Sequence, residues 1–218
     1  MSNPLSDKTG HSKQNYNSQL IIKIDRFSFH ADADPMPLLL CHALTPAAMV
    51  RAIDTTAQWS SDGHLQFSYR LSGDMARLLI PAPSVASRGE ALWEHTCFEA
   101  FIAVRGSPAY LEYNFSPSGQ WASYAFADYR QPDVAASPLP TPKITATLTE
   151  GRLELLARIA SSELPPPYAS SVLQIGLSAV IENTDTVDGN RSYWALSHQT
   201  PRPDFHLRAC FTLELSNP

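Results

Sequence analysis

Carboxylate, amide and aromatic side chains concentrate in one stretch near the middle of this 218-residue chain. Apolar and polar positions alternate over residues 97–104 and 110–115, as they do in two half-buried strands. Glu99 lies on one face of the first strand, and Glu112 and Asn114 lie on one face of the second. Carboxylates and amides form directional hydrogen bonds, and a carboxylate pair can also catalyse glycoside hydrolysis. These residues therefore offer either binding or hydrolytic chemistry.

The turn between these two strands determines which residues face each other. Gly106 stands at the first central position of a two-residue loop, which predicts a type II′ turn because that position needs a positive φ. The resulting register places Phe101 opposite Glu112 and Glu99 opposite Asn114. Every pair on the other face is then apolar or aromatic. Turn chemistry and hydrophobic pattern therefore support the same pairing.

A second turn, residues 116–119, leads into a third strand and leaves two registers open. As a three-residue loop that ends in a left-handed glycine, it places Tyr124 opposite Glu112 and directs Trp121 toward the core side. As a two-residue loop, it places Trp121 beside Asn114 on the polar face. The hydrophobic pattern favours Tyr124, and Trp121 stays the alternative.

Aromatic rings beside fixed polar groups are suited to binding a small carbohydrate-like ligand. The C–H groups of a sugar ring stack on aromatic faces, and its hydroxyls pair with carboxylates and amides. We therefore expect a non-catalytic ligand site on this face, the alternative being an ordinary solvent-facing sheet surface. The expected site residues are Trp93, Glu94, Glu99, Glu112, Asn114, Arg191, Trp194 and either Tyr124 or Trp121.

The same residues permit two other functions. The aromatic side chains could form a contact patch for a protein partner, because Tyr and Trp are enriched at interfaces. Glu99 and Glu112 could act as a hydrolase pair, which requires a separation of about 5–5.5 Å or 6.5–9.5 Å. A flat sheet face excludes water poorly, and the sequence lacks the common motifs of serine hydrolases, zinc proteases and nucleotide-binding folds. Binding is therefore favoured over catalysis.

Candidate ligands for metal or haem are sparse. Residues 182–191 are rich in oxygen donors and could hold a structural calcium ion, but their spacing favours an ordinary polar turn and no cofactor. His198 and His206 could form a metal-binding or acid–base pair. A haem iron needs axial ligands, for which Met75 and His64 are the nearest Met–His combination.

Composition narrows the range of partners. A net charge of -5 and a pI of about 5.8 disfavour nucleic acid, because no broad basic field attracts phosphates. No apolar run is long enough for a membrane span, and the polar N-terminus lacks a signal-peptide core. Cys41, Cys97 and Cys210 are widely spaced, which favours buried, reduced thiols. We therefore expect a cytoplasmic protein with no nucleic-acid or membrane partner.

Strand signals dominate the chain and predict an all-β, antiparallel β-sandwich. The predicted strands fall near residues 19–24, 65–71, 78–80, 97–104, 110–115, 121–130, 144–148, 153–159, 172–181, 192–197 and 210–215. The main helical signal is Thr45-Pro46, which could cap a helix over residues 47–57. We expect a disordered tail over residues 1–18 and one β-sandwich domain over residues 19–218.

A set of short motifs extends over about residues 21–215. The motifs are WE (93–94), CFEAF (97–101), YLEYN (110–114), SPSG (116–119), the segment 121–130, SYWALSH (192–198) and DFH (204–206). Together they resemble the DOMON-like family, which is related to the type 9 carbohydrate-binding modules. The resemblance implies a jelly-roll-like β-sandwich with a ligand site on a concave face. Relatives with this fold include sugar binders and haem binders, so the resemblance implies these two ligand classes as candidates, although many DOMON-like members have no assigned activity.

Overall fold

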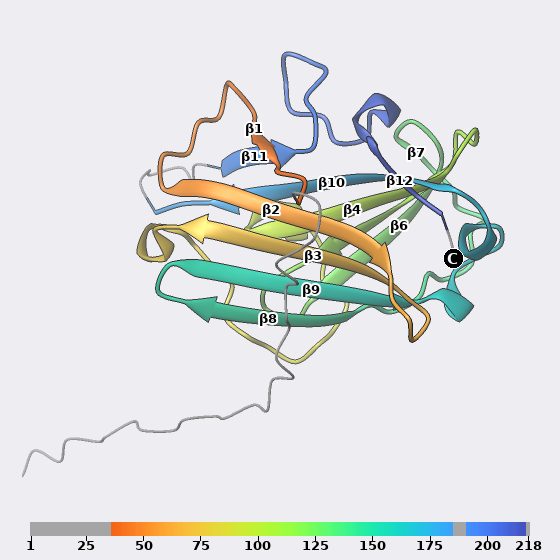
Figure 1. The fold of residues 1–218 in the computed structure, drawn as a ribbon, viewed down its shortest axis with the longest axis horizontal. Helices are drawn as coiled ribbons and strands as arrows, with labels where there is room; N and C mark the ends of the chain where they lie inside the picture. The colour runs from red at the N-terminus through yellow and green to blue at the C-terminus, as the bar shows by residue number, and fades with distance from the viewer. Residues whose placement is uncertain (1–35, 185–190, 217–218) are drawn as a thin grey trace, which may run out of the picture. The chain divides into compact units, whose positions relative to one another are not determined.

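The computed structural model describes residues 36–184 and 191–216, which form two facing β-sheets (Figure 1). The four-stranded sheet has the order β2 (Val50–Trp59), β3 (His64–Gly73), β9 (Arg152–Ala160) and β8 (Lys143–Thr149). The eight-stranded sheet has the order β1 (Leu40–Cys41), β11 (Arg191–Ala195), β10 (Leu173–Glu182), β4 (Cys97–Val104), β5 (Tyr110–Phe115), β6 (Trp121–Asp128) and β7 (Gln131–Pro132), with β12 (Leu213–Leu215) also paired to β10.

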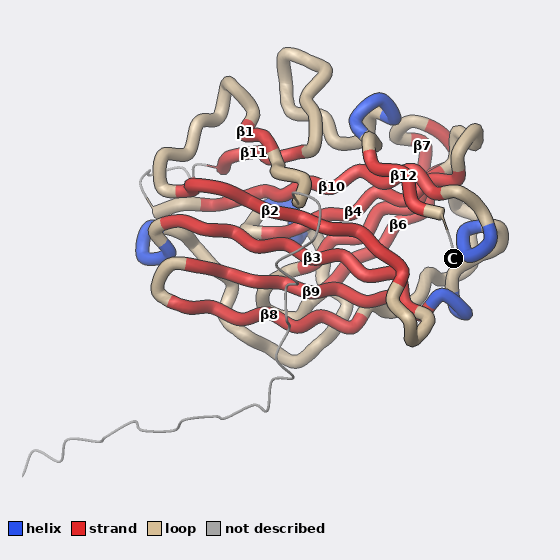
Figure 2. Tube along the Cα trace, viewed as in Figure 1, coloured by secondary structure: helices blue, strands red, loops and turns tan. Residues whose placement is uncertain are grey.

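All pairings between these strands are antiparallel, and the described helices are single 3-10 turns (Figure 2). The 3-10 turns are η1 (Met75–Arg77), η2 (Leu92–Glu94), η3 (Ser161–Glu163), η4 (Tyr168–Ser170) and η5 (Arg208–Cys210). The predicted antiparallel β-sandwich is confirmed. The expected tail 1–18 and the expected strand 19–24 lie outside the described residues.

The hydrophobic core lies between the two sheets and contains side chains from alternate strand positions. Phe67 of β3 stacks on Phe115 of β5 with ring centroids 6.0 Å apart, and Tyr69 lies 4.9 Å from Phe98 of β4. The Tyr69 hydroxyl donates to the backbone carbonyl of Glu99 across the same interface (2.7 Å). One face of β4 and β5 is thus occupied by the core, and functional side chains must lie on the other.

The register of β4 and β5 is the predicted one, with Glu99 opposite Asn114 and Phe101 opposite Glu112. The turn itself differs from the type II′ prediction. Its closing hydrogen bond runs from the Ser107 N–H to the Val104 carbonyl (3.1 Å), because Pro108 has no N–H to close a turn one residue later. Gly106 does adopt the expected positive φ, 83°.

The second turn is the predicted three-residue loop. Ser116 N–H donates to the Gln120 carbonyl (2.9 Å), and Gly119 takes the left-handed conformation with φ 92°. Tyr124 therefore pairs with Glu112, and Trp121 pairs with Phe115. The alternative that placed Trp121 beside Asn114 is wrong.

Two local predictions fail. The expected helix over residues 47–57 is strand β2, in which Ile53 packs into the core beside β3. The expected strand at residues 78–80 is reduced to one bridge between Leu78 and Asn183. In the first case a helix-capping dipeptide was outweighed by β-branched residues and by pairing with a neighbouring strand.

The three cysteines lie in the described part of the chain. Cys97 and Cys210 are buried free thiols, and Cys41 is half-buried and also free. Within residues 36–184 and 191–216 there is no helix whose length and apolar character would let it cross a bilayer.

Candidate functional site

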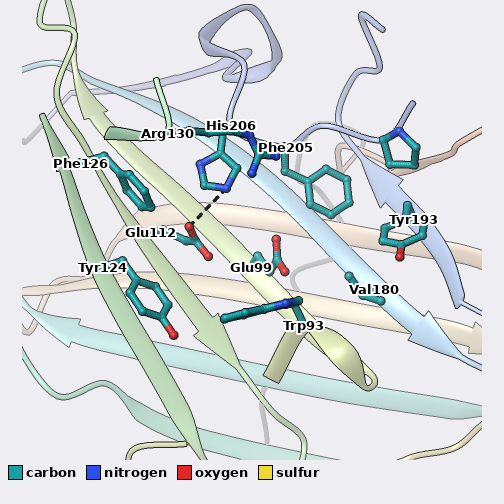
Figure 3. A pocket seen from close by; sticks show the side chains of 11 residues that line it. Trp93, Glu99, Glu112, Tyr124, Phe126, Arg130, Val180, Tyr193, Phe205 and His206 are labelled. Atoms are coloured by element: carbon teal, nitrogen blue, oxygen red, sulfur yellow. Dashed lines mark ion pairs between the residues drawn. The ribbon is translucent and has the colours of Figure 1, made fainter. Parts of the chain in front are cut away.

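A cavity of about 420 Å³ opens on the face of the eight-stranded sheet that points away from the core (Figure 3). Strands β4, β5, β6, β10 and β11 contribute side chains to it, and the segment before η5 and the 3-10 turn η2 complete its rim. The lining residues are Trp93, Glu99, Glu112, Tyr124, Phe126, Arg130, Val180, Tyr193, Pro203, Phe205 and His206.

Two carboxyl groups form the floor of this cavity. Glu99 of β4 is 4% exposed and Glu112 of β5 is 7% exposed. Each receives one side-chain hydrogen bond: Ser178 Oγ donates to Glu99 Oε2 (3.2 Å), and Asn114 Nδ2 donates to Glu112 Oε1 (2.8 Å). Burying two carboxyl groups this deeply is costly unless they are neutralised or paired.

The protonation of the floor follows from this burial. Burial raises the pKa of Glu99 to about 8, and repulsion from the Glu112 carboxylate adds to the shift. Burial also raises the pKa of Glu112, while the hydrogen bond from Asn114 and the charge of Arg130 act in the opposite direction. The two carboxyl groups therefore share less than two negative charges near neutral pH.

His206 approaches the floor from above. Its Nε2 lies 3.6 Å from Glu112 Oε2, and its Nδ1 lies 2.8 Å from the Tyr110 hydroxyl oxygen. Burial lowers the pKa of His206 to about 4, with the charge of Arg130 as a further cause, so the imidazole is neutral at pH 7. The Tyr110 oxygen also accepts from the backbone N–H of Arg130 (3.1 Å), so the hydroxyl hydrogen can be donated to His206 Nδ1, and in that arrangement the imidazole proton is on Nε2.

Arg130 is the Lys or Arg residue among the described residues that line the cavity, and its guanidinium is paired with Asp204. Its guanidinium donates to Asp204 Oδ1 (3.0 Å), and the Tyr129 hydroxyl donates to Asp204 Oδ2 (2.6 Å). The backbone N–H of His206 also donates to Asp204 Oδ1 (3.1 Å). Partial burial opposes ionisation of Asp204, but these hydrogen bonds lower its pKa. Asp204 thus fixes both Arg130 and His206 at the rim.

Aromatic side chains form the walls (Figure 3). Trp93, on η2, is 42% exposed and meets Tyr124 edge-on, with ring centroids 6.1 Å apart. Phe126 continues the Tyr124 side of the cavity, two residues further along β6. On the opposite side Tyr193 of β11 packs against Phe205 at 6.1 Å. The cavity thus has flat apolar sides and a polar floor.

Four of the predicted site residues line this cavity, namely Trp93, Glu99, Glu112 and Tyr124. Asn114 is fully buried on the same sheet face, opposite Glu99, where its side chain donates to Glu112. The remaining predicted residues lie elsewhere.

Trp194 and Trp121 are the clearest corrections. Trp194 is 6% exposed and belongs to the core between the sheets, where its indole N–H donates to Ser192 Oγ (2.9 Å). Because side chains alternate along β11, Tyr193 takes the cavity side and Trp194 the core side. Trp121 lies on the face of Phe115, with the Arg88 guanidinium 5.6 Å from its ring.

Glu94 and Arg191 also lie outside the lining. Glu94 ends η2 as an exposed residue, one position beyond Trp93. Arg191 opens β11 opposite Glu182. Glu94 was expected as an acceptor beside Trp93, and Arg191 as a hydroxyl or carboxylate anchor beside a cleft, but neither of them lines this cavity.

Sequence reasoning missed the other lining residues. Phe126 could have been found, because it is two positions from Tyr124 on the same strand face. The remaining missed residues are Arg130, Val180, Tyr193, Pro203, Phe205 and His206. They come from distant segments. Arg130 lies in the 121–130 motif, Tyr193 in SYWALSH, and Phe205 and His206 in DFH, but none of them was assigned to the site.

The candidate metal and haem ligands do not lie together in the described residues. His64 and Met75 stand at opposite ends of the ten-residue strand β3, and a strand rises about 3.3 Å per residue, so they cannot ligate one iron. His198 contacts the Leu40 carbonyl (2.9 Å) and the His42 ring, whereas His206 faces the cavity. Within the described ranges no three His, Cys, Asp or Glu side chains form a metal-binding group. Most of the candidate calcium loop, 185–190, is outside those ranges.

Comparison with solved structures gives matches over most of the chain. A protein from Bacteroides uniformis, described as a candidate carbohydrate-binding protein, matches with a TM-score of 0.59 and 16% identity, over 83% of this chain and 84% of that one. What is shared is the fold. At such low identity the match shows an antiparallel β-sandwich and nothing more specific.

Two further matches are family 9 carbohydrate-binding modules from Caldicellulosiruptor kristjanssonii. The module in complex with glucose has a TM-score of 0.49 and 11% identity, over 84% of this chain and 81% of that chain. The module in complex with cellotriose has a TM-score of 0.44 and 11% identity, over 74% and 71%. No protein-family model and no curated protein sequence matches the chain. The resemblance to the DOMON-like family therefore stays a prediction.

Proposed function

We propose that this protein binds a small carbohydrate in the cavity above β4 and β5. One observation carries the proposal: two nearly fully buried carboxyl groups, Glu99 and Glu112, form the floor of a 420 Å³ cavity whose walls are aromatic. Small-ligand sites typically combine apolar walls with a few fixed polar groups, in cavities of roughly 300–1,000 Å³. The volume suits a monosaccharide or a short oligosaccharide.

The chemistry of the lining supports a sugar over a purely apolar ligand. A sugar ring presents C–H groups to the rings of Trp93 and Tyr124, and its hydroxyls reach the carboxyl oxygens below. His206 adds an Nε2–H donor at the rim, and protonated Glu99 adds a second donor. The description of the Bacteroides uniformis protein as a candidate carbohydrate binder agrees with this proposal.

The test is calorimetric titration of the purified protein with a panel of mono- and oligosaccharides. Trp93→Ala is expected to weaken binding of the best ligand at least tenfold, which corresponds to about 1.4 kcal/mol. Trp121→Ala is the matched control, because Trp121 lies on the opposite sheet face and should leave the affinity unchanged. Equal losses in both variants, or no binding across the panel, would count against the proposal.

A second candidate function is glycoside hydrolysis, which is favoured by the raised pKa of Glu99. A general acid must keep its proton near neutral pH, and a neighbouring carboxylate such as Glu112 can serve as nucleophile or base. Chromogenic glycosides provide the assay. Turnover that disappears in both Glu99→Gln and Glu112→Gln would support hydrolysis, whereas binding without turnover would leave a binding protein.

A further inference from the structure

The cavity floor carries acidic groups without a cationic partner. Among the described residues that line the cavity, Arg130 is the one Lys or Arg, and its guanidinium is paired with Asp204. His206 faces Glu112, but its buried imidazole is neutral at pH 7. The charge of Arg130 favours the ionised form of both carboxyl groups, but because Arg130 is paired with Asp204 the lining does not neutralise two ionised carboxylates.

Two carboxyl oxygens also lack hydrogen-bond donors. Glu99 Oε2 accepts from Ser178, while Glu99 Oε1 accepts no hydrogen bond from any described residue. Glu112 Oε1 accepts from Asn114, while Glu112 Oε2 has His206 Nε2 at 3.6 Å, beyond a normal hydrogen bond. A ligand that fits this floor should bring several donors and a positive charge.

We propose that the bound carbohydrate is an amino sugar, whose primary ammonium group lies between Glu99 and Glu112 while its ring lies against Trp93 and Tyr124. This inference rests on the proposed function and specifies its ligand class. An ammonium group supplies three N–H donors, which matches the open oxygens on the floor. It also supplies the missing positive charge.

The aromatic walls support a cation as well. The faces of Trp and Tyr rings attract an ammonium group within about 6 Å of the ring centroid, most strongly where water is excluded. A quaternary ammonium ion would gain this attraction too, but it has no N–H for Glu99 Oε1. A neutral sugar would donate hydroxyls but brings no charge, so Glu99 would keep its proton when that sugar binds. The primary ammonium group satisfies both requirements.

Binding should then be linked to a proton. In the empty cavity the pKa of Glu99 is about 8, so below that pH its carboxyl group holds a proton. When the ammonium group binds, it donates an N–H to the carboxylate of Glu99, and the Glu99 proton passes to the buffer. The other ionisable groups that line the cavity are Glu112, Tyr124, Arg130, Tyr193 and His206, and the buried Cys97 thiol lies on the same face of β4 as Glu99.

Titration calorimetry with D-glucosamine and D-glucose, at pH 6 in two buffers of different ionisation enthalpy, tests this inference. Glucosamine is expected to bind at least tenfold more tightly than glucose and to release about one proton. Its affinity should rise between pH 5.5 and 7, while glucose should release no proton. Choline serves as the quaternary control and should bind at least tenfold more weakly than glucosamine.

Two variants assign the effect to the floor. Glu99→Gln should remove both the preference for glucosamine and the proton release, with a thermal melt to verify folding. Glu150→Gln, an exposed site in the turn between β8 and β9, should change neither.

Equal binding of glucose and glucosamine would overturn the amino-sugar inference and leave the proposed function standing. Tighter binding of glucosamine without proton release would also overturn the amino-sugar inference. So would a preference for glucosamine that persists in Glu99→Gln. Failure of both sugars to bind would count against the proposed function as well.

Discussion

At the scale of single residues, the carboxyl groups of Glu99 and Glu112 are more deeply buried than side chains on an open sheet surface. The sequence placed Glu99 and Glu112 on one polar face, but in the structure they are only 4% and 7% exposed, because Phe205, His206 and Trp93 line the cavity around them. Their pKa values therefore depend on the surrounding segments and not on the strands that carry them.

The raised pKa of Glu99 predicts a pH-dependent stability. Because the folded-state value, about 8, lies above the ordinary value of 4.5, the native state binds a proton that the unfolded state releases. This stabilisation is complete below pH 4.5 and is lost as the pH rises toward 8. Relative to wild type, Glu99→Gln should therefore gain stability with rising pH, by at most about 1.4 kcal/mol per pH unit. Urea unfolding at pH 5, 6.5 and 8 measures this difference, and a constant difference would contradict it.

Asn114 has a supporting role that can be separated from ligand contact. Its side chain is fully buried and donates to Glu112 Oε1 (2.8 Å). Asn114→Ala leaves that oxygen without a donor, so we expect a loss of about 1–3 kcal/mol in the free energy of unfolding at pH 7. The loss should shrink when the pH is lowered enough to protonate Glu112. Denaturant unfolding at pH 4 and pH 7 gives the comparison, and a loss of equal size at both values would argue against this role.

At the scale of elements, the sequence predicts pairing well where a short turn joins two strands. The Gly106 and Gly119 turns, combined with the alternating pattern, gave the registers of β4 with β5 and β5 with β6. No such turn joins β10 to β11 in the described residues, so the sequence could not decide which face of β11 each side chain takes. Trp194 was therefore assigned to the site, and Tyr193 was missed.

The contact between β10 and Phe211, the residue that follows η5, also affects the cavity. Gly176 of β10 lies under Phe211, and a Cβ at this position would stand 2.6 Å from Phe211 Cδ1. Phe211 in turn packs on Phe101, which contacts the His206 ring at 5.2 Å. Gly176→Ala should therefore destabilise the fold by about 1–3 kcal/mol and displace the rim of the cavity.

Thermal melts and sugar titration of the Gly176→Ala variant measure both effects. Gly151→Ala is the matched control, because the nearest atom to its added Cβ is an arginine nitrogen at 3.9 Å, an ordinary contact. Unchanged stability and affinity in Gly176→Ala would show that Phe211 can move without cost.

At the scale of the whole molecule, the two faces of the eight-stranded sheet differ in role. One of its faces packs on the four-stranded sheet, and the other carries the cavity. The sequence could predict the first face because apolar alternation along each strand identifies it. It could not predict the full cavity, because residues 203–206 and β11 lie about a hundred residues after Glu99 in the sequence. Such long-range placement depends on strand order, which no local pattern contains.

This two-sided organisation makes a prediction about core substitutions. Phe67 of β3 stacks on Phe115 beneath the sheet and does not line the cavity. Phe67→Ala should therefore lower the free energy of unfolding by about 3–5 kcal/mol, and the milder Ile159→Val by about 0.5–1.5 kcal/mol. At a temperature where each variant stays folded, sugar affinity should match that of the wild type, because the strands of the floor keep their register. Ile159→Val keeps most of the stability, so a change in its sugar affinity cannot be caused by unfolding. A parallel loss of affinity and stability would mean that core packing sets the geometry of the cavity floor, and the two faces would then have to be treated as one unit.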